Sequence, residues 1–312
     1  MIMGRLVDSV KRVGRFLFDK ETRFNYLCIL GAYNGLSDEA FLKKKFKIAM
    51  GYEPDLENPL TYSEKLQWLK LHDRKNIYTQ MVDKHEVKAL VRDMIGEEYV
   101  VPEYGCWDHF DDIDFDKLPD KFVLKCTHDS GGIYICKDKA RMDKAAVKEF
   151  MEKRLSRNSY IFEREWPYKN VKPRILAEKF IEEIASDDLR DYKFFCFDGN
   201  VPYLFVASER MGDSETKFDF FDREYNHLDL INGHPNAAVI PEKPANFDLM
   251  LELSEKMSKG IPQVRIDFYD TGEHVYFGEF TFSHWGGTKP FEPEKWDRIF
   301  GDCIKLPSKT HE

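Results

Sequence analysis

The pattern of hydrophobic and polar positions divides the chain into a helical first part and a strand-rich remainder. Apolar residues recur at helical spacing over 6–17, and residues 38–49 continue in the same style. The segment from Thr61 to Glu64 matches a capping box, which predicts the start of a third helix. A further helix is predicted over 77–94.

Short apolar or alternating segments follow, and they predict β-strands. Two of them are joined by Asp198-Gly199 and two by Thr271-Gly272, turns that are typical of β-hairpins. The predicted strands cover 99–101, 122–124, 133–135, 174–181, 191–197, 201–207, 264–270 and 275–282. Helices are predicted between them at 143–157 and 247–259. Helices and strands in this order indicate an α+β protein.

Composition narrows the functional classes. A net charge of −9 over 312 residues argues against a general nucleic-acid binder. The six cysteines are scattered without a C-x-x-C pair, which is typical of a reducing compartment and predicts a cytoplasmic protein. The basic amphipathic segment 6–17 has two interpretations that stay open: weak peripheral association with the inner face of a membrane, or a surface helix packed on its own domain.

Several charged residues stand in or beside apolar strands, where a charge is unfavourable unless it is paired or bound to an ion. They are Lys125, Glu178, Asp191, Lys193, Arg265, Asp267 and Glu279. Because a short turn joins their strands, we expect Asp267 and Glu279 to lie close together on one sheet face. Two carboxylates without histidine or cysteine neighbours favour a hard cation, Mg²⁺ or Mn²⁺, held together with substrate phosphates.

The stretch 121–137 joins a lysine at the end of a strand to a glycine-rich turn. Lys125 leaves the first strand, and Asp129-Ser130-Gly131-Gly132 leads into the second. An ammonium group and bare backbone N–H groups can together hold phosphate oxygens. A plain hairpin is the alternative when this stretch is considered alone.

Taken in order, these segments resemble the ATP-grasp superfamily, and within it the TupA-like ATP-grasp proteins of bacterial surface-polysaccharide biosynthesis. The resemblance covers about residues 55–295 and is carried by NPLTYSEKLQWLKLHD, VDKHEVK, FVLKCTHDSGG, ILAEKF, DYKFFCFDG, VRIDFY and FGEFTF. It implies two α+β subdomains that grip ATP, preceded by a helical N-terminal region. The implied divisions are 1–60 (helical region), 61–105 (helical segment leading into the core), 106–181 (small subdomain with the phosphate lid) and 182–312 (large subdomain with the metal site).

The resemblance also implies roles for individual residues. Lys84 and Lys125 correspond to the lysines that contact the phosphates of ATP. The implied lid consists of His128, Ser130, Gly131 and Gly132. The implied adenine hinge is Glu178, Lys179, Phe180 and Ile181, and Asp191 and Lys193 complete the nucleotide site, with Asp191 on the ribose.

Catalytic and metal-binding roles are implied further along the chain. Arg265, with Lys125, would steady the transferred phosphoryl group, and His284 would shuttle a proton from the amine. The implied metal ligands are Asp267, Glu279 and Thr281. Thr281 departs from the superfamily, which usually has Asn at this position. The glycines after His284 fit a loop that holds the acceptor.

The resemblance implies ATP-dependent ligation of a carboxylate to an amine through an acyl phosphate. The expected substrates are an amino acid or amine and a uronic acid of a capsule, O-antigen or teichuronic-type polymer; no oligomeric state is predicted. One alternative is a sugar-nucleotide glycosyltransferase that uses Asp112 and Asp114 as its metal motif. The other is a non-catalytic carbohydrate-binding protein on an ATP-grasp frame, which the threonine at 281 favours.

Overall fold

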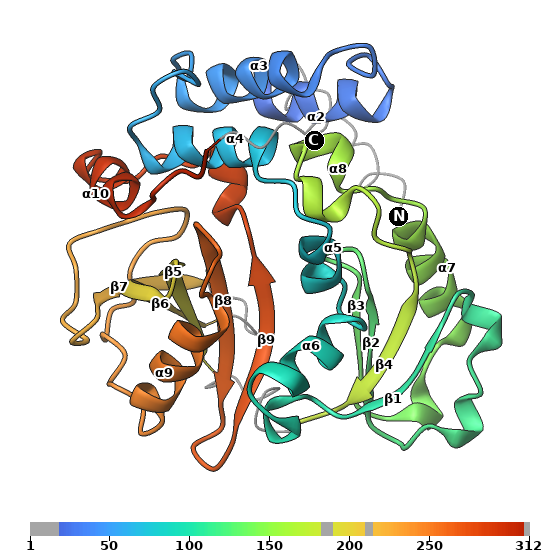
Figure 1. Ribbon diagram of the computed structural model, residues 1–312. Helices are drawn as coiled ribbons and strands as arrows, with labels where there is room; N and C mark the ends of the chain where they lie inside the picture. Colours follow the sequence, from blue (N-terminus) through green and yellow to red (C-terminus); the bar gives the residue numbers. More distant parts are fainter. Residues whose placement is uncertain (1–18, 182–189, 210–214, 309–312) are drawn as a thin grey trace.

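Two antiparallel sheets face each other, with a layer of helices across one end (Figure 1). The computed structural model describes residues 19–181, 190–209 and 215–308. The predicted helix over 6–17 and most of the acidic segment that precedes Asp191 lie outside these ranges. Within them, no helix is long and apolar enough to cross a membrane.

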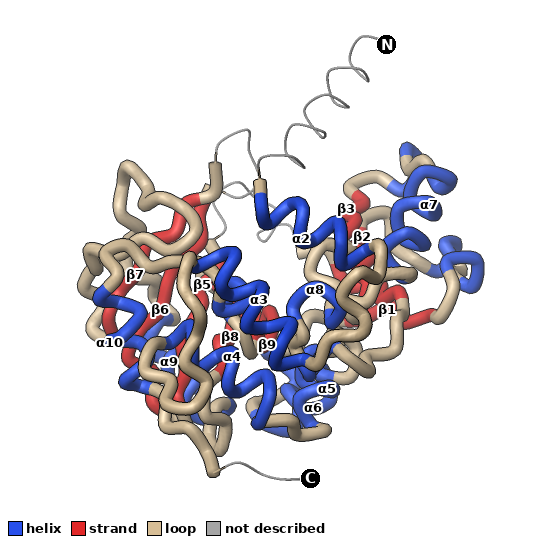
Figure 2. The backbone as a smooth tube through the Cα atoms, turned by 90° about the horizontal axis from the view of Figure 1, so that it is seen from above, coloured by secondary structure: helices blue, strands red, loops and turns tan. Residues whose placement is uncertain are grey.

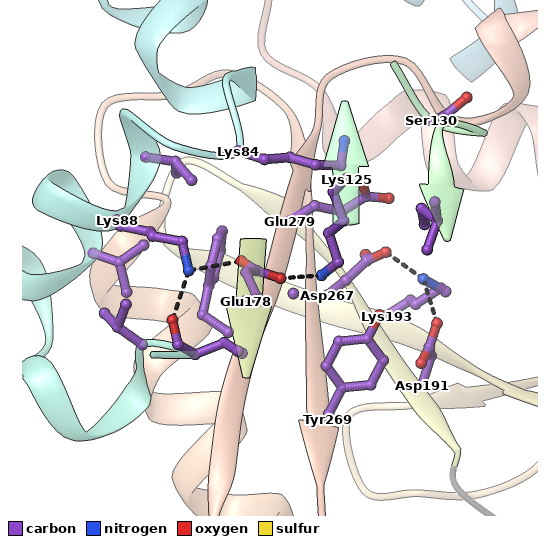
Figure 3. A pocket seen from close by; sticks show the side chains of 17 residues that line it. Lys84, Lys88, Lys125, Ser130, Glu178, Asp191, Lys193, Asp267, Tyr269 and Glu279 are labelled. Atoms are coloured by element: carbon purple, nitrogen blue, oxygen red, sulfur yellow. Dashed lines mark hydrogen bonds and ion pairs between the residues drawn. The ribbon is translucent and has the colours of Figure 1, made fainter. Parts of the chain in front are cut away.

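The smaller sheet has four strands in the order β1-β4-β2-β3. Their bounds are β1 Glu103–Trp107, β2 Phe122–Cys126, β3 Ile133–Cys136 and β4 Ile175–Lys179. Burial alternates along β2, so that Phe122 and Leu124 enter a core with Val147 and Met151 of α7 (Lys144–Leu155). Lys125 is directed to the other face, toward the larger sheet (Figure 3).

The larger sheet has five strands in the order β7-β6-β5-β8-β9. Their bounds are β5 Asp191–Phe197, β6 Asn200–Ser208, β7 Lys217–Asp222, β8 Val264–Asp270 and β9 Val275–Thr281. One face packs against α9 (Phe247–Met257) through Phe194 and Phe268. The opposite face packs against helices at both ends of the chain through Phe195 and Phe205.

The helical layer consists of segments from the two ends of the chain. Its members are α2 Lys20–Ile29, α3 Asp38–Met50, α4 Tyr62–His72 and α10 Lys295–Cys303. The predicted capping box is present at the start of α4, between Thr61 and Glu64. The carboxylate of Asp297 in α10 accepts a hydrogen bond from the backbone N–H of Ser63 at 2.8 Å. Seen from above, α2 and α3 lie over the junction of the two sheets (Figure 2).

Two sequence predictions between the sheets are wrong. The helix predicted over 77–94 is two helices, α5 Ile77–Val82 and α6 Val87–Met94. The break occurs because the Asp83 carboxylate accepts hydrogen bonds from the next backbone N–H groups, those of His85 and Glu86. Residues 99–101 form no strand: a 3₁₀ turn ends at Tyr99, and β1 begins only after Pro102.

The remaining elements are short. They are α8 Tyr160–Glu163 and the 3₁₀ turns η1 Glu97–Tyr99, η2 Phe110–Asp112, η3 Phe115–Lys117, η4 Lys139–Arg141, η5 Trp166–Tyr168 and η6 His284–Gly287. The domain bounds stay a prediction, although β1 spans the division placed between 105 and 106.

Candidate active site

A central cavity lies between the two sheets, lined by side chains from both (Figure 3). Its charged and polar lining is Lys84, Lys88, Lys125, Ser130, Glu178, Asp191, Lys193, Asp267, Tyr269 and Glu279. Its apolar lining is Val87, Val91, Val100, Val101, Ile133 and Phe277, next to Gly278. One cavity therefore brings together half of the predicted nucleotide residues and two of the predicted metal ligands, Asp267 and Glu279.

Glu178 holds the small-sheet side of the central cavity together. Its carboxylate lies 2.7 Å from the Lys88 ammonium and 2.5 Å from that of Lys125 (Figure 3). Burial alone would raise the pKa of Glu178, but the charges of the two lysines outweigh it and lower the pKa to about 2. Glu178 is therefore an anion that positions two cations. The sequence analysis gave Lys88 no role, although it stands four residues after Lys84.

The predicted lid residues divide into buried and exposed positions. The Lys84 ammonium donates to the backbone carbonyl of Asp129 at 3.1 Å, and the Asp129 carboxylate pairs with Arg154 at 2.5 Å. Ser130 and Gly131 are exposed, and Ser130 lines the cavity. His128 is buried, which lowers its pKa, and it does not line the central cavity. The geometry therefore supports a phosphate contact at Ser130 but not at His128.

Gly132 is required by close packing. A Cβ at this position would lie 2.7 Å from the Cβ of Cys126, because the backbone N–H of Cys126 donates to the Gly132 carbonyl at 2.7 Å. The loop is thus tied to the end of β2, directly after Lys125.

The large-sheet side of the central cavity carries the predicted metal residues. Asp267 on β8 is directly opposite Glu279 on β9, as the hairpin predicted. Arg265 grips both oxygens of Asp267 with bonds of 2.7 Å, and Lys193 donates to the same carboxylate. Burial alone would raise the pKa of Asp267, but these two cations lower it to about 2. Asp267 is therefore ionised, and a bound metal ion could replace the Lys193 ammonium as its partner.

These residues fit a divalent cation that substrate phosphates help to bind. Asp267 and Glu279 supply two carboxylates, the usual protein contribution to a Mg²⁺ site of this kind. No group of three or more His, Cys, Asp or Glu residues that could hold a metal occurs in the described part of the chain. The Thr281 hydroxyl accepts a hydrogen bond from Arg265 at 2.9 Å, so its role as a metal ligand stays a prediction.

His284 is placed behind Arg265 and not in a cavity. Its Nδ1 accepts from the Arg265 guanidinium at 2.7 Å, and its Nε2 lies 3.0 Å from the Asn232 side-chain oxygen. Burial, reinforced by the positive charge of Arg265, lowers the pKa of His284 well below its ordinary value. The geometry does not support the predicted proton shuttle; a neutral His284 positions Arg265.

The predicted adenine hinge is only partly at the cavity. Lys179, Phe180 and Ile181 do not line it, and the backbone N–H of Lys179 donates to the Pro102 carbonyl at 2.8 Å. Sequence reasoning missed the apolar wall, which comes from α6, the segment before β1, and the strands β3 and β9. The valines at 87 and 91, one helical turn apart beside Lys84 and Lys88, were the available signal.

A second cavity, the side cavity, adjoins the first and has a volume of about 590 Å³. Its lining is Glu21, Asp129, Ser130, Arg154, Arg157, Ser159, Phe162, Glu163, Glu165, Tyr168, Arg265, Glu279, Thr281, Ser283, Trp285, Gly286, Thr288 and Lys289. Ser130 and Glu279 line both cavities and mark where they meet.

One wall of the side cavity is formed by left-handed backbone. Trp285, Gly286 and Gly287 have φ values of 50°, 63° and 66°. Gln67 and Lys70 of α4 donate to the Gly286 carbonyl at 3.0 and 2.7 Å. The helical layer therefore fixes this loop, which the sequence identified only by its two glycines.

Two antiparallel sheets that enclose a cavity lined with lysines and carboxylates form the ATP-grasp fold. A family model described as TupA-like ATPgrasp matches residues 64–305, and the chain belongs to this family. No curated protein matches the sequence.

Solved structures with a similar arrangement are distant in sequence. D-alanine–D-alanine ligase from Bacillus anthracis is 17% identical with a TM-score of 0.38, over 65% of this chain and 57% of that one. The Helicobacter pylori ligase of the same name is 13% identical with a TM-score of 0.40, over 74% and 60%. D-cycloserine synthetase DcsG is 12% identical with a TM-score of 0.39, over 72% and 71%. The chain thus matches less than two thirds of either D-alanine–D-alanine ligase.

Proposed function

We propose that this protein is an ATP- and Mg²⁺-dependent ligase that joins a carboxylate to an amine through an acyl phosphate. The observation that carries the proposal is the junction of the two cavities at Ser130 and Glu279. A nucleotide in the central cavity would present its terminal phosphate at this junction, where an acid held in the side cavity can receive it.

The residues of the central cavity suit the nucleotide. The apolar wall formed by Val87, Val101 and Phe277 would take the adenine ring, and Lys84 and Lys125 would contact phosphates. Asp191 remains the proposed ribose contact, next to Lys193 at 3.2 Å. In this structure Lys125 and Lys193 each pair with a carboxylate, and the phosphates of ATP would compete for both ammonium groups.

Phosphoryl transfer to a carboxylate makes a poor acylating agent into a good one, because phosphate leaves more easily than oxide. Mg²⁺, held by Asp267 and Glu279, would supply charge neutralisation for the phosphates. Arg265 lines the side cavity with its guanidinium fixed by Asp267, and it would stabilise the negative charge on the transferred group. Closure of the loop from His128 to Gly132 would exclude water from the acyl phosphate.

We infer that the acid is a uronic acid and the amine an amino acid or another small amine. Trp285 supports the proposal of a sugar substrate. It is 42% exposed, lines the side cavity and has a left-handed backbone that is unusual for a bulky residue. A sugar ring could stack on such an indole. Arg157 and Lys289 add exposed positive charge to the cavity lining. We further propose that the reaction belongs to surface-polysaccharide synthesis, in the cytoplasm or at the inner face of the membrane; the match to the TupA-like family supports this proposal.

The glycosyltransferase alternative loses support from the position of its motif. Asp112 and Asp114 line neither cavity, and Asp114 pairs with Lys117 at 3.0 Å in a half-exposed turn. A non-catalytic carbohydrate-binding protein remains the second candidate, because Thr281 replaces the usual metal-ligating asparagine.

The test is release of ADP and phosphate with a panel of uronic acids and amino acids, next to thermal-shift measurements with Mg²⁺ and either ATP or UDP-sugars. We expect stabilisation by Mg-ATP, and ADP release that requires both substrates. Stabilisation by a UDP-sugar and not by ATP would refute the ligase. Stabilisation by ATP without turnover for any pair would favour the binding protein.

A further inference from the structure

The side cavity contains a buried carboxylate that forms no ion pair with any cation in the described part of the chain. Glu165 is 9% exposed and lines the cavity together with Arg265, Glu279 and Thr281. Within 19–181, 190–209 and 215–308, no hydrogen bond or ion pair to its side chain is found. Burial without a partner is unfavourable for a carboxylate, which makes this position a candidate for function.

The neighbouring acid shows the contrast. Glu163 also lines the side cavity, but it pairs with Lys45 of α3 and lies 3.9 Å from the Lys70 ammonium. Between the two acids, Arg164 has a left-handed backbone with φ 51°, and its guanidinium stacks over Phe41 of α3 at 4.1 Å. The helical layer therefore fixes the segment that brings Glu165 to the cavity.

Charged and titratable groups of five elements interact electrostatically with Glu165. They are Lys45 of α3, Lys70 of α4, Glu163 of α8, Tyr168 of η5 and Arg265 of β8. Burial raises the pKa of Glu165 to about 7, with Glu163 adding to the effect and Lys70 opposing it. Such a group exchanges a proton readily at neutral pH.

We propose that Glu165 is the general base that deprotonates the incoming amine in the side cavity. The proposal rests on the proposed ligase function. It replaces His284, which is buried behind Arg265 and lines neither cavity.

The step balances as follows. The substrate ammonium gives one proton to the Glu165 carboxylate, and the freed nitrogen lone pair forms the C–N bond at the acyl carbon. The C–O bond to phosphate breaks with its electron pair staying on phosphate. The second N–H proton leaves with it as HPO₄²⁻, and Glu165 later passes its proton to water.

Hydroxylamine separates the two halves of this reaction. It is already neutral near pH 7 and captures an acyl phosphate as a hydroxamate without a base. With the uronic acid and amine that the panel identifies, we expect Glu165→Gln to slow amide formation by at least about 100-fold. The same variant should form hydroxamate at close to the wild-type rate. Glu149→Gln is the matched control, because Glu149 is an exposed acid of α7 that lines neither cavity.

The pH profile adds a second readout. Amide formation by wild type and by Glu149→Gln should rise as pH increases through about 7, and the residual activity of Glu165→Gln should lack this rise beyond the titration of the amine itself. Equal amide rates in wild type and Glu165→Gln would overturn the proposal, and so would loss of hydroxamate together with amide. Absence of hydroxamate from wild type itself would instead refute the ligase.

A stability measurement checks the ionisation without any substrate. The folded pKa of Glu165 is raised above its ordinary 4.5, so wild type loses stability as pH rises through about 7. The Tm of Glu165→Gln minus the Tm of wild type should therefore be larger at about pH 8 than at about pH 5. A difference in Tm that does not change with pH would contradict the proposed titration.

Discussion

The central and side cavities adjoin each other but balance their charges in opposite ways. In the central cavity, Glu178 and Asp267 each lie between two cations and have pKa values lowered to about 2. In the side cavity, Glu165 has a raised pKa, and no ion pair joins it to a cation of the described residues. The first arrangement suits a polyanion, which can take lysines over from carboxylates, and the second suits a proton transfer.

The two cavities also differ in what holds their walls. Strands of both sheets carry most charges of the central cavity, whereas loops pinned by α3 and α4 form much of the side cavity. A regular scaffold fixes one site, and the added helical layer shapes the other. Nucleotide binding and acceptor use should therefore respond separately to mutation.

The largest effect is expected at the junction of the cavities. Glu279→Ala removes a carboxylate from the proposed metal site, and we expect ATP-dependent product formation to fall by about 100- to 1000-fold. The extra thermal stabilisation that Mg²⁺ gives to bound ATP should disappear as well. Glu273→Ala, in the exposed turn of the same hairpin, is the control and should change neither. Full activity of Glu279→Ala would disprove the metal assignment.

A large effect on stability is expected at Glu178. The folded pKa is lowered from 4.5 to about 2, so the carboxylate stabilises the fold above pH 4.5 and loses this contribution as pH falls toward 2. The shift corresponds to about 3 kcal/mol at neutral pH. Glu178→Gln should lower the free energy of unfolding in urea by about that amount at about pH 7 and by much less below about pH 3. A loss that is independent of pH would show that Glu178 acts by packing alone.

A smaller effect is expected at Gly287, directly after the lining residue Gly286 of the side cavity. Gly287→Ala places a Cβ 2.6 Å from the Gln67 side chain and 3.0 Å from the Leu66 Cβ, on a left-handed backbone. We expect a loss of about 1–3 kcal/mol in unfolding free energy. Apparent affinity for the acid should fall while the thermal shift with Mg-ATP is kept. An equal loss of ATP binding would show that the two cavities are not separable.

The central cavity was more predictable than the side cavity for a physical reason. Alternation along two strands joined by a short turn places Asp267 opposite Glu279 without any knowledge of distant packing. Glu165 stands in an aromatic connection without periodicity, and its burial depends on helices far away in sequence. The division of 77–94 into two helices was not predicted for a related reason, because the apolar spacing continues across the turn formed by Asp83.

The smallest effect is expected at the acidic run that suggested a glycosyltransferase. Asp114 is half-exposed and pairs with Lys117 in the same turn, which is worth well under about 1 kcal/mol at a surface site. Asp114→Ala also removes the hydrogen bond that the carboxylate accepts from the backbone N–H of Asp116. It should therefore leave product formation and Mg-ATP stabilisation at wild-type values and lower the unfolding free energy by no more than about 1 kcal/mol. The decisive comparison is with Glu279→Ala in the same assays. If Asp114→Ala lost product formation and Glu279→Ala kept it, the metal would bind at the acidic run. The contrast between the two cavities would then not describe the active site.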